Sequence, residues 1–270
     1  MQLVKPIVKR CLPYELINAL WWLLRPEPSN TLGFWRLLLL KRYPFRFLVQ
    51  LRLLYLELTR KPVFLAVSEE ERKGFDRNFR YRHRFGRQRV ERWLRVCAAS
   101  NKSFRDSRLL IIGPRNEAEL ILAWLHGFRW DNIFAIDLFS VSPKIAVMNA
   151  ERMDFPDDSF DIVVACAVLP YIPNASDALR EMARICRPGG ILLLRNSYYE
   201  RLPNPYFSRP MDRYLGSMEA YLDYVFFREK EPIEIDLRKA GIADSGTAPV
   251  LVEYAGVYIK KQPKEGVAKC

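Results

Sequence analysis

The sequence predicts an α/β fold in which a parallel sheet is covered by helices on both of its faces. Between residues 101 and 197, continuous apolar runs of strand length alternate with segments that have the apolar spacing of amphipathic helices. Strands buried on both sides have this continuous apolar character, because neither side meets water. In such a sheet we expect the ligand beyond the carboxyl ends of the strands, near the point where the strand order reverses.

Individual elements follow from the same patterns. The first apolar run ends at Gly113, where a glycine permits a tight turn into the helix that follows. A proline and two glycines at residues 187–190 predict another turn, between a helix and the next apolar strand. We therefore expect strands at residues 109–112, 133–136, 162–165 and 191–194, helices at 117–125 and 175–186, and a C-terminal hairpin at 250–260.

Positive charge is concentrated at the N-terminal end of the chain. The whole chain has a net charge of +12; residues 1–100 hold 21 Lys and Arg against 8 Asp and Glu, whereas the remainder holds 22 against 23. The strand–helix alternation begins where this excess of positive charge ends. We therefore divide the chain into a basic, aromatic-rich helical extension at 1–100 and an α/β domain at 101–270.

The extension has interpretations that the sequence leaves open. Residues 1–62 mix aromatic and aliphatic side chains with arginines, which is typical of short helices that lie on an anionic membrane surface. The same pattern equally suits a helical cap that packs on the α/β domain and covers the substrate. The basic, aromatic segment at 81–95 fits nucleic acid or anionic lipid, but a solvent-exposed helix face is the simpler interpretation.

Composition excludes several classes of protein. Half of the residues are apolar, which argues against a disordered chain. The five cysteines form no C-x-x-C pair and the only histidines are His83 and His126, so we expect no disulfide framework and no metal site. No apolar run approaches the roughly 20 residues of a membrane-spanning helix. Glu15 and Asn18 interrupt the first apolar segment, which argues against a cleaved signal. We expect a cytoplasmic protein, with peripheral membrane association as the alternative.

The first chemical signal is the spacing between Gly113 and Asp137. A glycine after the first strand allows the backbone to approach a ligand closely. An acidic residue at the end of the next strand, just over twenty residues later, can accept hydrogen bonds from both hydroxyls of a ribose. Alone this spacing is a weak signal, because glycines in turns and aspartates at strand ends are both common.

A more specific signal lies at residues 148–190, which read MNAERMDFPDDSFD and then IVVACAVLPYIPNASDALREMARICRPGG. This stretch resembles the type 11 family of class I methyltransferases, which depend on S-adenosylmethionine (SAM). That family reads D-A-x-x-L-P-F-x-D-x-S-F-D, an apolar strand, a helix with A-L-x-E-x-x-R-V-L, and K/R-P-G-G. The resemblance extends from Ser107 to about Lys261 and is weaker beyond Ser197. It implies a Rossmann-like sheet of seven strands with helices on both faces, in which Phe155 and Phe160 are packing residues.

The resemblance implies a set of cofactor contacts. Gly113 would lie against the methionine part of SAM, Asp137 would hold the ribose, and Leu138 would pack on the adenine. Asn149 corresponds to the position that contacts the adenine amino group, with Ala150 beside it.

The resemblance also implies residues at the reacting end of the site. Cys166 ends the fourth strand, where the backbone faces the sulfonium. Tyr171, Tyr198 and Tyr199 follow the fourth and fifth strands, where the substrate enters, although packing in a lid or core is the favoured interpretation of each one singly. The sequence nominates no general base, and methyl transfer needs one only when the acceptor must lose a proton.

The glycine loop departs from the family pattern D/E-x-G-x-G-x-G. Ile111 stands at the acidic position, and Arg115 and Glu117 stand at the second and third glycines. Asn149 likewise replaces the usual aspartate. One interpretation is that Arg115 pairs with the methionine carboxylate and that Asn116 makes the turn in a left-handed conformation. The other is that these side chains block a decayed site.

These observations predict SAM-dependent methyl transfer to a small-molecule or lipid-linked acceptor, with a membrane surface as one place of action. The altered loop makes a non-catalytic scaffold or binding protein the first alternative. The basic extension makes an RNA methyltransferase the second. Against methylation of a nucleic-acid base, the fourth strand ends in CAVL at 166–169 rather than N/D-P-P-Y/F. Nucleic acid is therefore the less favoured partner.

Overall fold

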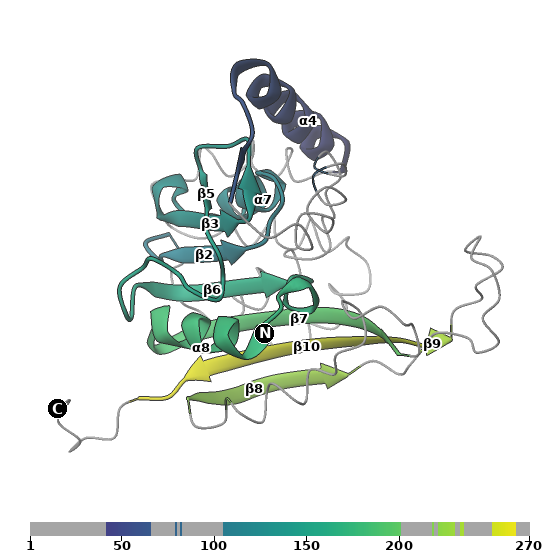
Figure 1. Cartoon of the computed structure of the whole chain (residues 1–270). Coiled ribbons are helices and arrows are strands. Elements are labelled where there is room, and N and C mark those ends of the chain that lie inside the picture. Colours follow the sequence, from purple (N-terminus) through teal and green to yellow (C-terminus); the bar gives the residue numbers. More distant parts are fainter. Residues whose placement is uncertain are drawn as a thin grey trace, which may run out of the picture.

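The computed structural model describes residues 42–65, 79, 82, 105–200, 218, 221–229, 233–234 and 250–262 (Figure 1). The predictions made for residues 1–41 and, apart from Arg82, for the basic segment 81–95 lie outside these residues. The described part contains the sheet, helices that cover it and the segments that follow the carboxyl ends of its strands.

A twisted sheet of eight strands organises the domain, which confirms the predicted α/β architecture, although seven strands were expected. Its first five strands in spatial order are parallel to their neighbours, and the next strand is antiparallel to both of its neighbours. A short additional strand, β9 (Ile233–Glu234), pairs with the antiparallel one. The spatial order is β5 (Ile145–Val147), β3 (Ile133–Asp137), β2 (Leu109–Ile112), β6 (Phe160–Cys166), β7 (Cys186–Glu200), β10 (Val250–Lys260) and β8 (Leu222–Glu229).

Alternate residues of the central strands contribute to two separate hydrophobic clusters, one on each face of the sheet. From β2, Leu110 and Ile112 pack with helix α8 (Ala175–Ile185). Leu109 and Ile111 pack instead with α7 (Ala118–Leu125) and α4 (Arg42–Thr59). The prediction of helices on both faces is therefore confirmed, and the continuous apolar character of the strands has the expected cause.

Helix α4 is one uninterrupted helix of 18 residues, within the segment 1–62 for which the sequence suggested short helices. Pro44 lies in its first turn, where a missing backbone N–H breaks no helical hydrogen bond. Its inner face carries Phe45, Val49 and Leu53, which are buried in the cluster that contains α7. Among the described residues, no helix is both long enough and apolar enough to cross a membrane.

The predicted C-terminal hairpin is wrong, because residues 250–260 form one continuous strand, β10. This strand lies between β7 and β8 and pairs with both, from Val250 opposite Glu200 to Ile259 opposite Ile191 in the case of β7. The turn predicted at residues 187–190 appears as an irregularity inside β7. Phe160 of β6 pairs with Cys186 of β7, whereas Ile162, two residues later in β6, pairs with Ile191 of β7. The extra residues of β7 lie between these two pairs, and among them Gly189 has a φ of 72°.

Two adjacent leucines of α4 test whether the helix is part of the folded core. Leu53 is 4% exposed, whereas Leu54 is 54% exposed. We expect Leu53→Ala to lower the free energy of unfolding by about 2–4 kcal/mol, because it removes buried methyl groups and leaves a cavity. Leu54→Ala is the matched control, with an expected change below about 0.5 kcal/mol. Denaturant titration measures both, and equal losses would contradict the packing of α4.

Candidate functional site

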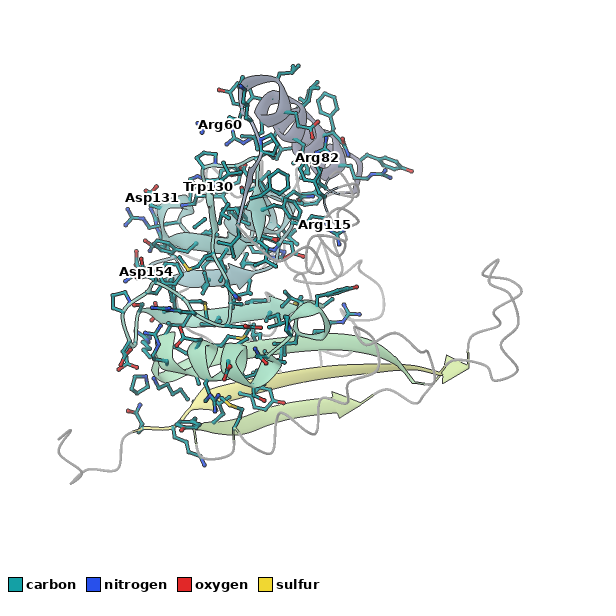
Figure 2. All side chains as sticks on the ribbon, in the orientation of Figure 1. Arg60, Arg82, Arg115, Trp130, Asp131 and Asp154 are labelled. Atoms are coloured by element: carbon teal, nitrogen blue, oxygen red, sulfur yellow. The ribbon has the colours of Figure 1, made fainter. Side chains whose placement is uncertain are left out.

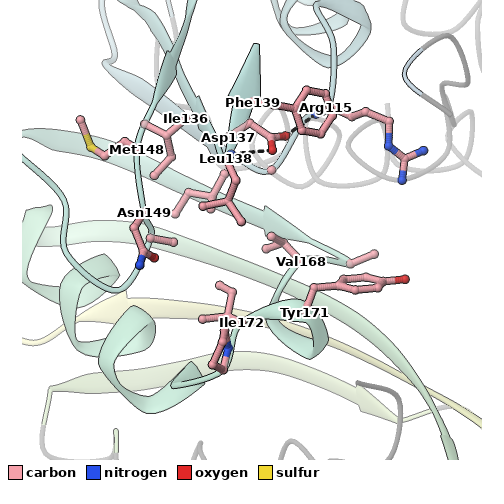
Figure 3. Close-up of a pocket in the computed structure, with 15 residues that line it drawn as sticks. Arg115, Ile136, Asp137, Leu138, Phe139, Met148, Asn149, Val168, Tyr171 and Ile172 are labelled. Carbon is pink, nitrogen blue, oxygen red and sulfur yellow. Dashed lines mark hydrogen bonds between the residues drawn. The ribbon is translucent and has the colours of Figure 1, made fainter. Parts of the chain in front are cut away.

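A pocket open to solvent lies where β2, β3 and β6 end (Figure 3). The register explains why these segments meet: Ile112 pairs with both Ile136 and Ala165, so the residues that follow them lie along one edge of the sheet. Seven of the residues predicted for the site line this pocket. They are Gly113, Arg115, Asp137, Leu138, Asn149, Ala150 and Tyr171.

Asp137 presents an oriented carboxylate in the pocket wall. Its Oδ2 accepts a hydrogen bond from the backbone N–H of Arg115 at 2.8 Å, and its Oδ1 accepts one from the N–H of Leu138 at 2.7 Å (Figure 3). Burial raises the pKa of this carboxyl to about 6, against the opposing effect of the backbone donors. At neutral pH the group is therefore anionic, and each oxygen retains the capacity to accept a further hydrogen bond.

The loop after β2 requires a glycine at one position. Gly113 has a φ of 68°, and a Cβ there would lie 2.6 Å from Cγ2 of Val168. The backbone N–H of Gly113 also donates to the carbonyl oxygen of Ile136 at 2.9 Å. A larger residue would therefore separate this loop from the segment that follows β6, on the opposite wall of the pocket.

Two non-glycine residues of the pocket wall have left-handed backbone conformations. Arg115 has a φ of 64° and Ala167 has a φ of 56°. The sequence placed the left-handed residue at Asn116, and this detail is wrong. Arg115 occupies that conformation instead, and its N–H donates to Asp137. Such conformations cost of order 1–3 kcal/mol each, and they cluster at functional sites.

Asn116 and Cys166 do not line the pocket. The amide Oδ1 of Asn116 accepts a hydrogen bond from the N–H of Ala118 in the first turn of α7, and its Nδ2 donates to the carbonyl oxygen of Arg82. Cys166 is buried in the cluster on the α7 face, and the next residue, Ala167, lines the pocket in its place. Side chains alternate along β6, which places Cys166 on the α7 face, and Ala167 follows the strand with a left-handed backbone.

The remaining predicted tyrosines lie further along β7. Tyr198 and Tyr199 pair with Val252 and Leu251 of β10, beyond Arg195, which is the last residue of β7 to pair with β6. The position of their side chains is outside the described part of the structure. Several lining residues were missed by the sequence analysis, and most are apolar neighbours of predicted ones: Phe139, Met148, Ala167, Val168, Ile172 and Pro173.

The motif at 148–161 is held mainly by packing and by one arginine of α8. Phe155 and Phe160 are in edge-to-face contact with ring centroids 5.0 Å apart, which confirms them as packing residues. The guanidinium of Arg184 donates to the carbonyl oxygens of Met153 and Phe155 and pairs with the carboxylates of Glu181 and Asp157. These contacts fix the segment that follows Asn149 and Ala150 at the pocket.

Glu117, which stands at the third glycine of the family pattern, is buried and tied to α4. Its side chain is 1% exposed, and its two oxygens accept hydrogen bonds from Nε and a terminal nitrogen of Arg52 at 2.7 and 3.2 Å. The hydroxyl of Ser142 also donates to this carboxylate. A bidentate arginine and a hydroxyl compensate for the removal of the charge from water.

A second contact joins α4 to the same loop. The guanidinium of Arg82 pairs with the carboxylate of Glu57 of α4 at 2.7 Å. The backbone carbonyl oxygen of Arg82 accepts a hydrogen bond from Nδ2 of Asn116. Figure 2 shows Arg82 between α4 and Arg115. Residues 116 and 117 thus connect the pocket loop to the N-terminal region. These contacts explain why an amide and a carboxylate stand at these positions, although neither side chain lines the pocket.

A third contact reaches the opposite side of the pocket loop. Strand β1 (Val63–Phe64) pairs with β4 (Phe139–Ser140), directly after Asp137 and Leu138. The ring of Phe139, which lines the pocket, packs against those of Phe79 and Phe64 with centroids 5.6 and 6.3 Å apart. The N-terminal region is therefore part of the wall that supports the pocket.

Comparison with known proteins agrees with this geometry. Residues 129–194 match the family model described as "Methyltransferase domain". This part of the chain is therefore similar to a methyltransferase domain. The match includes Asp137, the motif at 148–161 and strand β6, and thus most of the pocket.

Two curated relatives are similar to parts of this chain. Ubiquinone/menaquinone biosynthesis C-methyltransferase UbiE of Hahella chejuensis is 42% identical over 114 residues, which are 42% of this chain and 45% of that protein. Phosphatidylethanolamine N-methyltransferase of Cereibacter sphaeroides is 38% identical over 55 residues, 20% of this chain and 27% of that protein. The chain thus spans less than half the length of these relatives. Among solved structures, the MccD protein is similar, with a TM-score of 0.48 and 15% identity over 62% of this chain and 96% of that one.

The buried ion pair of Arg52 and Glu117 can be tested by removing its cation. Arg52→Ala leaves Glu117 buried without its main partner, and we expect a loss of about 3 kcal/mol in unfolding free energy. This is the lower end of the usual range, because the side chain of Arg52 is 35% exposed. The double variant Arg52→Ala/Glu117→Gln should regain part of the loss, because it removes the unpaired charge. Denaturant melts of the wild type, Arg52→Ala, Glu117→Gln and the double variant measure the coupling, and a loss below about 1 kcal/mol in Arg52→Ala would contradict it.

Proposed function

We propose that this chain is a SAM-dependent methyltransferase that acts on a small-molecule or lipid-linked acceptor. The observation that carries the proposal is the carboxylate of Asp137, oriented by two backbone donors in a pocket at the carboxyl ends of parallel strands. A carboxylate in this position suits the two hydroxyls of a ribose.

The residues present fit such a cofactor. Asp137 would accept the ribose hydroxyls, Leu138 and Ala150 would contact the adenine, and Asn149 lies at the same end of the pocket (Figure 3). Gly113 lines the same pocket, and a Cβ at this position would clash with the side chain of Val168. When bound, SAM supplies an activated methyl group on a sulfonium, so the reaction depends mainly on the positions of donor and acceptor.

The chain's own part in the chemistry is to bind, orient and exclude water. Among the lining residues that the structure describes, the ionisable side chains are Arg115, Asp137 and Tyr171. Tyr171, on the short helix η2 (Leu169–Tyr171), extends toward the same end of the pocket as Arg115 (Figure 3). We assign it a role in positioning the acceptor. Apolar neighbours such as Val168 and Ile172 favour an acceptor with an apolar part.

The named acceptors of the two relatives support this class. One is named for ubiquinone and menaquinone and the other for phosphatidylethanolamine, so both act on molecules that partition into membranes. Together with the basic, aromatic residues at 1–62, this supports action on a lipid-linked acceptor at a membrane surface.

A scaffold without catalysis is the second candidate, and one observation favours it. Asn116 and Glu117, within the altered glycine loop, make structural contacts toward the N-terminal region rather than lining the pocket. The two candidates differ in whether the pocket retains affinity for S-adenosylhomocysteine (SAH), the product of methyl transfer.

Binding of SAH should depend on Asp137 and on pH. Calorimetric titration should detect binding of SAH. Asp137→Asn should weaken the free energy of SAH binding by about 1–3 kcal/mol, because it removes a charged hydrogen-bond acceptor. Because the carboxyl has a pKa of about 6 in the free protein and hydroxyl donors favour its ionised form, affinity should rise with pH through about 6 and level off above it. The Asn variant should lack this dependence. Absence of any SAH binding at neutral pH would favour the scaffold.

Arg115 should interact with the carboxylate of the cofactor's amino-acid part. Its guanidinium extends away from the Asn149 end of the pocket (Figure 3). Arg115→Met should therefore weaken SAH binding by about 1–2 kcal/mol and leave adenosine, which lacks that carboxylate, unaffected. Arg115→Gly, which suits the left-handed backbone, should lose SAH affinity in the same way. An increase in SAH affinity in either variant would identify the arginine as an obstruction.

A further inference from the structure

Helix α4 has a second apolar face, opposite the face that packs on the domain. Phe47 and Leu58 are 67% and 77% exposed, although both are large apolar side chains. They belong to a row at helical spacing that we call the outer face. Its members are Tyr43, Phe47, Leu51, Leu54, Tyr55 and Leu58, all exposed.

Packing within the domain does not account for the outer face. The inner face already contributes Phe45, Val49, Leu53 and Leu56 to the buried residues of the domain. Residues three, four and seven apart lie on one side of a helix, so the outer side chains form a continuous apolar stripe along α4. Contiguous exposed apolar surface of this kind marks a site of interaction with a membrane or another molecule.

The charges around the outer face are positive. Arg46 is exposed within α4, and Arg60 and Lys61 are exposed just after it. Figure 2 shows Arg60 at the periphery of the domain, beside α4. Glu57 is the sole carboxylate of α4, and it is paired with Arg82. The wider N-terminal third carries the same sign, with 21 basic and 8 acidic residues in positions 1–100.

We propose that α4 lies flat on an anionic lipid bilayer, with its outer face inserted among the headgroups and acyl chains. An apolar and aromatic face bordered by cations, without an exposed carboxylate, is complementary to such a surface. A protein partner or a second copy of this chain would have to supply matching acids. The helix does not span the bilayer, because its inner face is part of the domain's core.

The same helix would hold the pocket close to the bilayer. Arg52 on its inner side binds Glu117 in the pocket loop, and β1, which follows α4 closely, pairs with β4 beside Leu138 in the pocket wall. This part rests on the proposed function, since it gives a lipid-linked acceptor access to the site. The binding of α4 to lipid does not require any methyl transfer.

The test is flotation of the full chain with phosphatidylcholine vesicles, with and without phosphatidylglycerol, at low and high salt. The wild-type protein should float with the anionic vesicles, and part of the binding should persist at high salt because the apolar contribution is not screened. The triple variant Phe47→Ser/Leu54→Ser/Leu58→Ser should lose at least about tenfold in the bound fraction. Arg46→Gln/Arg60→Gln/Lys61→Gln should lose binding mainly at low salt.

Tyr221→Ser is the matched control, because Tyr221 is 51% exposed beside β8, at the other end of the sheet from α4 (Figure 1). It should float like the wild type. Failure of the wild type to float, or flotation of the triple variant at the wild-type level, overturns the inference. Conversion of a dimer to a monomer by the triple variant with flotation unchanged would assign the outer face to a second copy instead. A lower melting temperature in the triple variant with flotation unchanged would assign it to another segment of this chain.

SAH titration separates this inference from the proposed function. Failure of the wild-type protein to float, while it still binds SAH, overturns the membrane inference alone. Flotation of a protein that does not bind SAH overturns the proposed function alone. Since the wild-type comparison between neutral and anionic vesicles involves no substitution, the inference stays testable even if the triple variant fails to fold.

Discussion

The buried carboxylate of Glu117 connects the parts of this structure that would otherwise be independent. It lies at the start of α7, directly after the pocket loop, and it is held by Arg52 of α4 and by the hydroxyl of Ser142. A buried charge is stable only when its partners are in place, so the positions of α4, α7 and the segment after β4 depend on one another. The conformation of the pocket loop is part of that arrangement.

The pocket itself depends on backbone geometry more than on side chains. Left-handed conformations at Gly113, Arg115 and Ala167 bring the loops after β2 and β6 into contact and aim one N–H at Asp137. Two of these positions are occupied by non-glycine residues, at a cost that the surrounding contacts must offset. The strained backbone lies where a ligand would bind, and the carboxylate that it orients has a pKa raised by burial. Both are typical of binding sites rather than of packing.

Helix α4 has two roles that follow from its two apolar faces. The inner face completes the core over α7, and Arg52 on that side compensates the charge of Glu117. The outer face remains exposed and is bordered by cations. This arrangement explains two residues at the glycine loop, because Asn116 binds Arg82 and Glu117 binds Arg52 of the N-terminal region.

The sequence by itself determined strands β2, β3, β6 and β7, helices α7 and α8, the parallel sheet, and the positions of Gly113 and Asp137 at strand ends. These follow from apolar periodicity and from residues whose local chemistry has few alternatives. It also identified Asn149, Ala150 and Tyr171, because the motif around them has a constant spacing from the strands. Only the tertiary structure decided which face of α4 is buried, because both faces are apolar. It likewise decided that residues 250–260 form one strand, since the partners of β10 are remote in sequence. The left-handed turn at Arg115 and the pairing of Glu117 with Arg52, 65 positions away, arise from contacts between distant segments, which local patterns do not contain.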